Sequence, residues 1–326
     1  MELIGAARVH ELLAYDGLIE ALRQAHLGGM PTMSDRHIYQ QPHPDGRPDI
    51  LILLPAWQAN DGILAKVVTS FPRNRELHER PTVNSLYIFM NGETGAPEAI
   101  FDGEAVIFRK TSADSALGCS LLARKDARTL LMVGAGGLAP YLVRAHCSVR
   151  HIERVLVWNR THAAGERLAA ALSAEGYPAE SVADLDAALG EADIVSSATM
   201  AESPIIKGRL LKPGAHLDLV GSFTPQMRES DDDVLQRASI FVDHEQTTKR
   251  SGDFLDPYAR GVITPADVKG DLFALCQGTV AGRRAEDEIT MMKNGGGSHI
   301  DYFVSRYLVE RLRKAKVGAP REMIAV

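Results

Sequence analysis

The segment Arg128–Thr161 constrains the fold more than any other, because it contains a glycine-rich turn between two short apolar runs. The first run, 130–133, suits a strand buried on both faces, and it leads directly into the turn. The pattern predicts a helix over 140–147 and a second strand over 155–158. The segment therefore predicts a strand, turn, helix and strand of a parallel α/β sheet.

The turn has the pattern GxGxxA of dinucleotide-binding folds. The first glycine makes the tight turn, the second lets the backbone approach a pyrophosphate, and the small last residue, Ala139, lets helix and strand pack closely. The pyrophosphate then lies at the positively polarised start of the helix. The alternative is a glycine turn in some other parallel sheet. We expect cofactor contacts from the turn residues Gly134, Ala135, Gly136, Gly137 and Leu138.

The residues after the second strand indicate which dinucleotide is preferred. NAD-preferring units carry Asp or Glu there, which accepts hydrogen bonds from the adenosine ribose. This chain has Asn159, Arg160 and Thr161. A carboxylate would repel a 2′-phosphate, whereas Arg160 can bind it through its planar guanidinium and its two neighbours can add uncharged hydrogen bonds. We predict NADPH as the cofactor, with NADH as the alternative. An ordinary basic loop is the other interpretation.

The composition is that of a soluble globular protein with enough material for two cores: 326 residues, 45% hydrophobic and 24% charged. The net charge of -6 gives no reason to bind nucleic acid or an anionic membrane, so local charges must bind any anionic ligand. The cysteines show no CxxC spacing, so we expect neither disulfides nor a metal site, and a reducing cytoplasm fits best. We expect no signal peptide and no membrane span.

The remaining segments predict an α+β region before the nucleotide unit and more strands after it. Helical periodicity covers 8–27, and a helix over 113–124 enters the nucleotide unit. The last helix, 302–315, is amphipathic and is expected to return to the first region. Strands are predicted over 50–55, 63–70, 85–91, 99–102 and 106–108 in the first region, and over 193–197, 216–221 and 240–243 in the second.

Ligands of doubly wound sheets bind at the carboxyl ends of the strands. Ala198 and Thr199 follow the strand predicted over 193–197, and Val220 lies near the end of the next strand. We therefore expect these three residues at the cofactor.

Several motifs, taken in order, match one family. The chain resembles the ornithine cyclodeaminase/μ-crystallin family over nearly its whole length. The resemblance implies a homodimer and the chemistry of small imino or amino acids at a nicotinamide. The motifs are LAKVV (64–68), FPRN (71–74), KTSA (110–113), VGAGGLAP (133–140), ADIVSSAT (192–199), PGAHLDLVGS (213–222), VDHEQT (242–247) and EITMMKNGGG (288–297) with Asp301.

The predicted fold class is α/β. A Rossmann-type doubly wound parallel sheet is expected over 113–301. The resemblance implies that both chain ends, 1–112 with 302–326, form an α+β domain for dimerisation and substrate binding.

The resemblance also assigns site residues. Lys66 falls on the family's active-site lysine, and Lys110, with Arg109 beside it, aligns with an arginine that binds the substrate carboxylate. Arg36 corresponds to a second such arginine. Asp301 either lies in the site or caps the last helix. The resemblance further implies that Thr111 and Asn294 lie near the nicotinamide or the substrate.

One departure from the family pattern changes the expected reaction. Cyclodeaminases that turn ornithine into proline resemble each other in carrying Asp shortly after the Val-Gly that ends a later Rossmann strand, where this chain has Phe223. Cyclodeamination calls for an acid or base beside the reacting amine. Reduction of a protonated cyclic imine requires mainly positioning and hydride delivery.

The sequences LVGSFTP and KNGGGSH resemble those of bacterial relatives that reduce cyclic ketimines. We therefore expect an NAD(P)H-dependent oxidoreductase acting on C=N bonds. It would reduce Δ1-pyrroline-2-carboxylate to L-proline, or Δ1-piperideine-2-carboxylate to L-pipecolate. The alternatives are an ornithine cyclodeaminase, a 3-hydroxyproline dehydratase and a μ-crystallin-like binding protein without activity.

Overall fold

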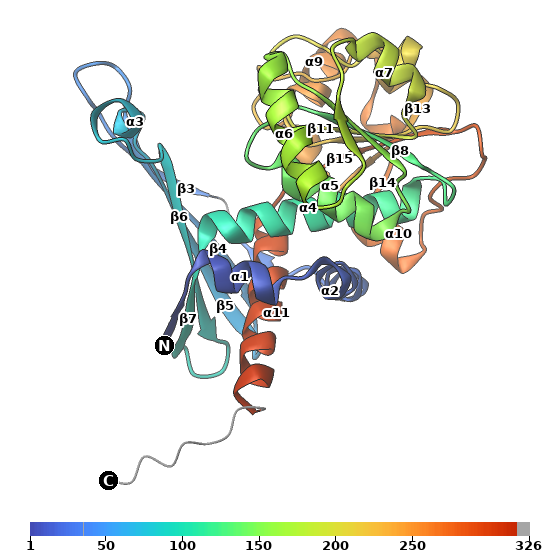
Figure 1. Cartoon of the computed structure of the whole chain (residues 1–326). Coiled ribbons are helices and arrows are strands. Elements are labelled where there is room, and N and C mark those ends of the chain that lie inside the picture. Colours follow the sequence, from blue (N-terminus) through green and yellow to red (C-terminus); the bar gives the residue numbers. More distant parts are fainter. Residues whose placement is uncertain (35, 318–326) are drawn as a thin grey trace, which may run out of the picture. The chain divides into compact units, whose positions relative to one another are not determined.

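The computed structural model describes residues 1–34 and 36–317 (Figure 1). The chain divides into two compact units. The first unit comprises Met1–Lys110 and the chain from Gly297 onward, and the second is the continuous segment Thr111–Gly296. Both ends of the chain therefore contribute to one α+β unit. Helix α4 (Gly103–Leu122) contributes residues to both units.

The first unit contains a seven-stranded sheet in the order β1-β7-β6-β5-β4-β2, with β3 also paired to β4. All of its pairings are antiparallel except that of β1 with β7. Its strands are β1 (Glu2–Ile4), β2 (Thr32–Met33), β3 (His37–Gln41), β4 (Asp49–Gln58), β5 (Gly62–Ser70), β6 (Val83–Asn91) and β7 (Pro97–Asp102), and its other helices are α1 (Ala6–Leu12), α2 (Tyr15–Leu27), α3 (Asn74–Leu77) and α11 (Ser298–Val317).

Helix α11 packs against β4, β5 and β6 and against α2 (Figure 1). Side chains alternate between the two faces of a strand, so every second residue of these strands points toward α11. Leu64, Tyr87 and Phe89 lie on that face and are buried, and the ring of Phe89 lies 5.9 Å from that of Tyr302 on α11. The amphipathic last helix therefore closes the core of the first unit.

Two expectations for the first unit were wrong. The segment 106–108 is not a strand, because α4 begins at Gly103, where the Asp102 carboxylate accepts a hydrogen bond from the backbone N–H of Ala105 (2.9 Å). The helix predicted over 8–27 is two helices, since Leu13 leaves the helical conformation at φ −100° and ψ 48°. Its apolar residues are buried: Leu12, Leu13, Leu18, Ile19 and Leu22.

The second unit contains an eight-stranded sheet in the order β10-β9-β8-β11-β12-β15-β13-β14, and all of its pairings are parallel. The chain moves outward from β8 to β10 and then returns to β11 on the other side of β8, which places the topological switch at β8 and β11. The predicted Rossmann-type doubly wound sheet is confirmed. Its strands are β8 (Thr129–Val133), β9 (Arg154–Trp158), β10 (Ala179–Ser181), β11 (Ile194–Ser197), β12 (His216–Leu219), β13 (Ala238–Val242), β14 (Val268–Asp271) and β15 (Ile289–Lys293).

Both faces of this sheet are apolar, as a buried parallel sheet requires. In β8, Leu131 and Val133 belong to one core cluster, whereas Leu130 and Met132 belong to another. The helices of the unit, besides α4, are α5 (Ala139–Val149), α6 (His162–Ala174), α7 (Leu185–Glu191), α8 (Asp232–Arg237), α9 (Gly252–Arg260) and α10 (Leu272–Gln277). None of the helices in the described part of the chain is apolar enough over a sufficient length to cross a membrane.

Candidate functional site

The turn after β8 has the shape that a dinucleotide requires. Gly134 has φ 106°, and a Cβ atom there would lie 2.7 Å from the backbone oxygen of Ala198. Only glycine fits this position without strain. A Cβ atom at Gly136 would meet nothing within 4 Å, and Gly136 and Gly137 are exposed. The turn therefore leaves open space in front of the start of α5, where a pyrophosphate fits.

The loop after β9 is joined to this turn. The Asn159 side-chain oxygen accepts a hydrogen bond from the backbone N–H of Ala135 (3.2 Å), and its amide nitrogen donates to the backbone oxygen of Thr161 (2.9 Å). Asn159 thus holds the loop in place. Arg160 is exposed and forms no ion pair with any residue among 1–34 and 36–317, so its guanidinium can bind an added anion.

Ala198, Val220 and Asn294 follow the ends of β11, β12 and β15, which are neighbours in the sheet. The carboxyl ends of these parallel strands lie at one edge, so the structure brings the three predicted residues to the same edge as the glycine turn.

A buried carboxylate missed by the sequence analysis, Glu229, supports this edge. It accepts hydrogen bonds from the backbone N–H and hydroxyl of Thr199 (both 2.8 Å) and from the backbone N–H of Gly221 (2.6 Å). Burial raises the pKa of Glu229, although nearby Lys293 opposes this. Thr199, a predicted cofactor residue, therefore uses its side chain to position the backbone. Glu229 lies in an irregular segment, where no local pattern predicts a buried charge.

In the first unit, two lysines contact one carboxylate. The ammonium of Lys66, on β5, lies 3.2 Å from one oxygen of Asp301, on α11. The ammonium of Lys110, on α4, lies 2.5 Å from the other oxygen. Tyr87, on β6, donates a hydrogen bond of 2.7 Å from its hydroxyl to that second oxygen. We call Lys66, Tyr87, Lys110 and Asp301 the lysine cluster.

The lysine cluster carries a surplus of positive charge. Burial, Lys110 and Arg36 lower the pKa of Lys66 to about 8, against the opposing effect of Asp301. Burial alone would raise the pKa of Asp301, but the two lysines and the Tyr87 hydrogen bond hold it at about 2. The side chains of Lys66 and Lys110 are mostly buried, with exposed fractions of 11% and 7%. The cluster is therefore suited to bind a carboxylate.

The structure distinguishes between two neighbouring basic residues. Arg109 lies over the ring of Tyr15 (4.6 Å to the ring centroid) and contacts His10, whereas Lys110 reaches Asp301. Arg36 lies immediately before β3, close enough to Lys66 to influence its pKa. The capping alternative for Asp301 is wrong, because α11 begins at Ser298. Tyr87 was missed, although it stands directly opposite Lys66 in the β5–β6 ladder.

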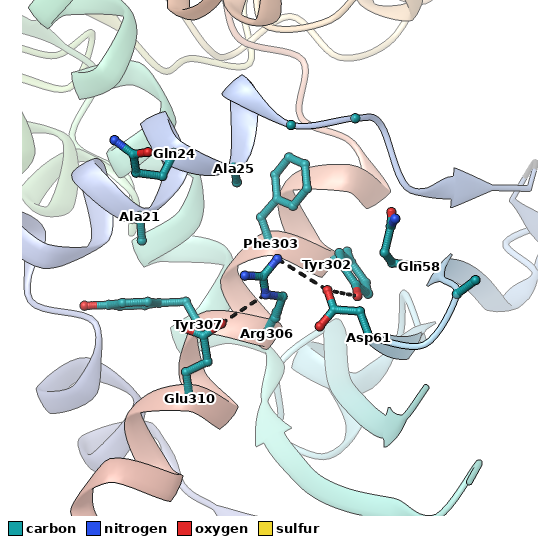
Figure 2. Close-up of a pocket in the computed structure, with 13 residues that line it drawn as sticks. Ala21, Gln24, Ala25, Gln58, Asp61, Tyr302, Phe303, Arg306, Tyr307 and Glu310 are labelled. Atoms are coloured by element: carbon teal, nitrogen blue, oxygen red, sulfur yellow. Dashed lines mark hydrogen bonds and ion pairs between the residues drawn. The ribbon is translucent and has the colours of Figure 1, made fainter. Parts of the chain in front are cut away.

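A separate cavity of about 490 Å³ in the first unit does not include the lysine cluster in its lining (Figure 2). Its charged side chains pair with one another: Asp61 accepts from the Tyr302 hydroxyl (2.9 Å) and lies 3.3 Å from Arg306, which also contacts Glu310 (3.0 Å). One cation faces two carboxylates there, so the cavity does not favour an anionic ligand. Among the described residues, no three His, Cys, Asp or Glu side chains come together as a metal site would require.

Comparison with known proteins places these features in a family. The Δ1-pyrroline-2-carboxylate reductase of Paracoccus denitrificans is 42% identical over 298 residues, which cover 91% of this chain and 92% of that protein. The enzyme of the same name from Colwellia psychrerythraea is 34% identical, covering 96% of this chain and 99% of that protein.

Among solved structures, the Δ1-pyrroline-2-carboxylate reductase of Thermococcus litoralis in complex with NADH and L-proline matches with a TM-score of 0.88 at 26% identity. The match covers 98% of this chain and all (100%) of that one. The profile of the ornithine cyclodeaminase/mu-crystallin family matches residues 4–316. This chain therefore belongs to the ornithine cyclodeaminase/mu-crystallin family.

Proposed function

We propose that this protein is an NADPH-dependent reductase of cyclic imino acids, which forms L-proline from Δ1-pyrroline-2-carboxylate and L-pipecolate from Δ1-piperideine-2-carboxylate. The observation that carries the proposal is the lysine cluster, where two lysines contact one buried carboxylate and leave a surplus positive charge for a substrate carboxylate. The names of the similar proteins from Paracoccus denitrificans and Colwellia psychrerythraea support the same reaction.

Lys110 and Arg36 bind the substrate carboxylate. Lys110 is fixed by Asp301 at 2.5 Å, and its remaining N–H groups can donate to a second carboxylate. Arg36 is exposed at the start of β3 and can reorient toward the ligand. A lysine binds a carboxylate as a point charge rather than through two parallel hydrogen bonds, so the orientation of the ring depends on the second cation.

Lys66 supplies the proton. A reduced nicotinamide dinucleotide, held by the glycine turn, would supply the hydride for the imine carbon, and the electron pair of the C=N bond would then require a proton at nitrogen. That nitrogen takes up a proton from the ammonium of Lys66, which is then reprotonated from solvent. A pKa near 8 leaves Lys66 protonated at neutral pH but makes it a better donor than an ordinary lysine.

Asp301 and Tyr87 position the donor. Asp301 contacts Lys66 at 3.2 Å, and the ring of Tyr87 lies 5.1 Å below the same ammonium. These contacts restrict the rotamers of a long side chain, and a positioned acid is more effective than a mobile one.

The dinucleotide is assigned to the glycine turn and to Arg160. The open space at Gly136 would admit the pyrophosphate, and the exposed guanidinium of Arg160 would bind the 2′-phosphate that distinguishes NADPH from NADH. Asn159 and Glu229 hold the backbone on either side of the turn.

The proposed active form is a homodimer. The face of the first unit's sheet that points away from α11 is apolar: Trp57 pairs with Ile63, and Val67 with Leu86. Tyr39, Trp57 and Leu86 on this face are exposed by 57%, 52% and 44%. A contiguous apolar face of this kind is typical of a surface that a second subunit covers.

The test is a substrate panel followed by absorbance of the reduced nicotinamide. The purified protein is supplied with NADPH or NADH and with Δ1-pyrroline-2-carboxylate, Δ1-piperideine-2-carboxylate, L-ornithine or a 3-hydroxyproline. We expect imine-dependent oxidation of NADPH and no reaction of ornithine. Formation of proline from ornithine with catalytic NAD⁺, without imine reduction, would show that the protein is a cyclodeaminase. Dehydration of 3-hydroxyproline without nicotinamide turnover would show that it is a dehydratase.

A further inference from the structure

A chain of buried hydrogen bonds runs through the second unit to the end of β15. The side-chain nitrogen of Asn294 donates to the backbone oxygen of Thr111 and to the hydroxyl oxygen of Ser115, both at 3.0 Å. Ser115 in turn donates to one oxygen of Asp218 (2.8 Å). The other oxygen of Asp218 accepts from Ser196 (2.7 Å) and contacts Nε2 of His146 (3.1 Å). Side chains from α4, α5, β11 and β12 thus meet at one carboxylate.

The direction of each hydrogen bond in this chain is fixed by groups that can only accept. The carbonyl of Thr111 requires that the nearer side-chain atom of Asn294 is the nitrogen, which settles the orientation of the amide. The carboxylate of Asp218 requires that Ser115 donates its single proton to it, so Ser115 must accept from Asn294. Both N–H groups of Asn294 are therefore used inside the protein.

The side-chain oxygen of Asn294 remains, and it accepts no hydrogen bond from any residue among those the structure describes. It is held as an acceptor at the edge of the sheet where the cofactor is proposed to bind. The ligand group that it recognises must carry an N–H or O–H.

The pKa shifts of Asp218 and His146 agree with this arrangement. Burial alone would raise the pKa of Asp218, but His146, Ser196 and Ser115 lower it. Burial alone would lower the pKa of His146, but chiefly the hydrogen bond to Asp218 raises it to about 10. The two side chains are fully buried and lie 3.1 Å apart, and Asp218 also accepts from Ser115 and Ser196, so it acts as an acceptor in this arrangement.

The position of Asn294 indicates what it binds. It is the first residue after β15, which lies three strands from β8 and its glycine turn, roughly 14 Å by the usual strand spacing. Arg160, on the opposite side of β8, follows β9. If Arg160 marks the adenosine end of the dinucleotide, the β15 side belongs to the nicotinamide end.

We infer that the Asn294 side-chain oxygen accepts a hydrogen bond from the carboxamide N–H of the nicotinamide, and that Asp218, through Ser115, is a positioning residue that keeps this acceptor in place. This inference rests on the proposed function, because the proposed function identifies the cofactor as a nicotinamide dinucleotide. A fixed acceptor for the carboxamide sets the rotation of the nicotinamide ring and hence which of its faces is presented for hydride transfer.

The experiment compares two ligands that differ only at the nicotinamide end, by calorimetry in the absence of substrate. One is NADP⁺, and the other is 2′-phospho-ADP-ribose, which lacks the nicotinamide ring. Asn294→Leu should lower the affinity for NADP⁺ about tenfold, which is the effect of one lost hydrogen bond. The affinity for 2′-phospho-ADP-ribose should change by no more than about twofold. Ser115→Ala should act in the same direction with a smaller effect. Asp218→Asn, which replaces an acceptor by a group that can donate, should resemble Asn294→Leu.

Ser196→Ala is the matched control, because Ser196 donates to the same carboxylate but does not contact Asn294. It should lower the melting temperature without changing the ratio of the two affinities. If Asp218→Asn does not fold, Ser115→Ala still tests the link.

Equal weakening of both ligands, or of neither, in Asn294→Leu and Ser115→Ala would overturn the inference. Failure of the proposed function can be told apart from failure of this inference. The ratio of the two affinities is measured without substrate, so it does not depend on which imine, if any, the protein reduces.

Discussion

Lys66 and Tyr87 stand directly opposite each other in the β5–β6 ladder and contact opposite oxygens of the same carboxylate, Asp301. The sheet register therefore fixes the position of the ammonium relative to the phenol, and α11 supplies the group that joins them.

Replacing Lys66 with alanine should slow imine reduction by a factor on the order of 10² to 10⁴, the usual contribution of a positioned acid. NADPH affinity, measured by fluorescence titration, should stay unchanged, since Lys66 belongs to the first unit and the dinucleotide residues to the second. Lys314→Ala, which alters an exposed lysine of α11, is the control. A Lys66→Ala enzyme with normal turnover would show that the proton comes from elsewhere.

The rate should depend on pH through Lys66. The protonated ammonium is the active form, so kcat/KM for the imine should be level below the pKa of about 8 and fall about tenfold per pH unit above it. Asp301 raises the pKa of Lys66, so Asp301→Asn should move this fall to lower pH. The control Asp61→Asn removes a carboxylate of the same unit that pairs with Tyr302 and Arg306. If kcat/KM of Asp301→Asn began to decrease at a higher pH than in the unaltered protein, Lys66 would not be the titrating group.

Arg160→Ala should lower the affinity for NADPH by roughly 10-fold to 100-fold, as expected for the loss of a charged hydrogen bond. The affinity for NADH should stay nearly unchanged. Arg167→Ala, an exposed arginine on α6, controls for a general change in surface charge. The measurement is the ratio of kcat/KM for the two cofactors. A higher kcat/KM for NADH than for NADPH in the unaltered protein would reject the predicted preference.

Light scattering at micromolar concentration should give the mass of a dimer. Trp57→Glu combined with Leu86→Glu places two charges on the apolar sheet face and should convert the dimer to monomer. Met200→Glu is the matched control, because Met200 is 72% exposed but belongs to the second unit. A monomeric unaltered protein, or a double variant that remains dimeric, would remove this face as the interface.

The sequence predicts local features of the fold better than distant contacts. The glycine turn could be found because its requirements, a positive φ and room for a phosphate, lie within six consecutive residues. The helix α4 was partly missed because Val106, Ile107 and Phe108 are residue types that favour strands, and the Asp102 hydrogen bond that begins the helix is not visible as a pattern.

The lysine cluster shows the same limit. Lys66 and Lys110 could be named only through the family resemblance, because nothing near them in the sequence indicates that they share a carboxylate. Tyr87 and Asp301 are 214 residues apart, so their hydrogen bond is a consequence of the fold. Asp218 lies within the motif PGAHLDLVGS, but its contact with His146 depends on the packing of α5 against the sheet.

The division of the first unit between both ends of the chain has a consequence for biosynthesis. The second unit is one continuous segment and can fold as soon as it leaves the ribosome. Lys66 is synthesised 235 residues before Asp301, so its ammonium has no counterion from α11 during most of translation. The sheet of the first unit must wait for α11 to cover it, so the core of that unit is completed only after the whole second unit has been synthesised.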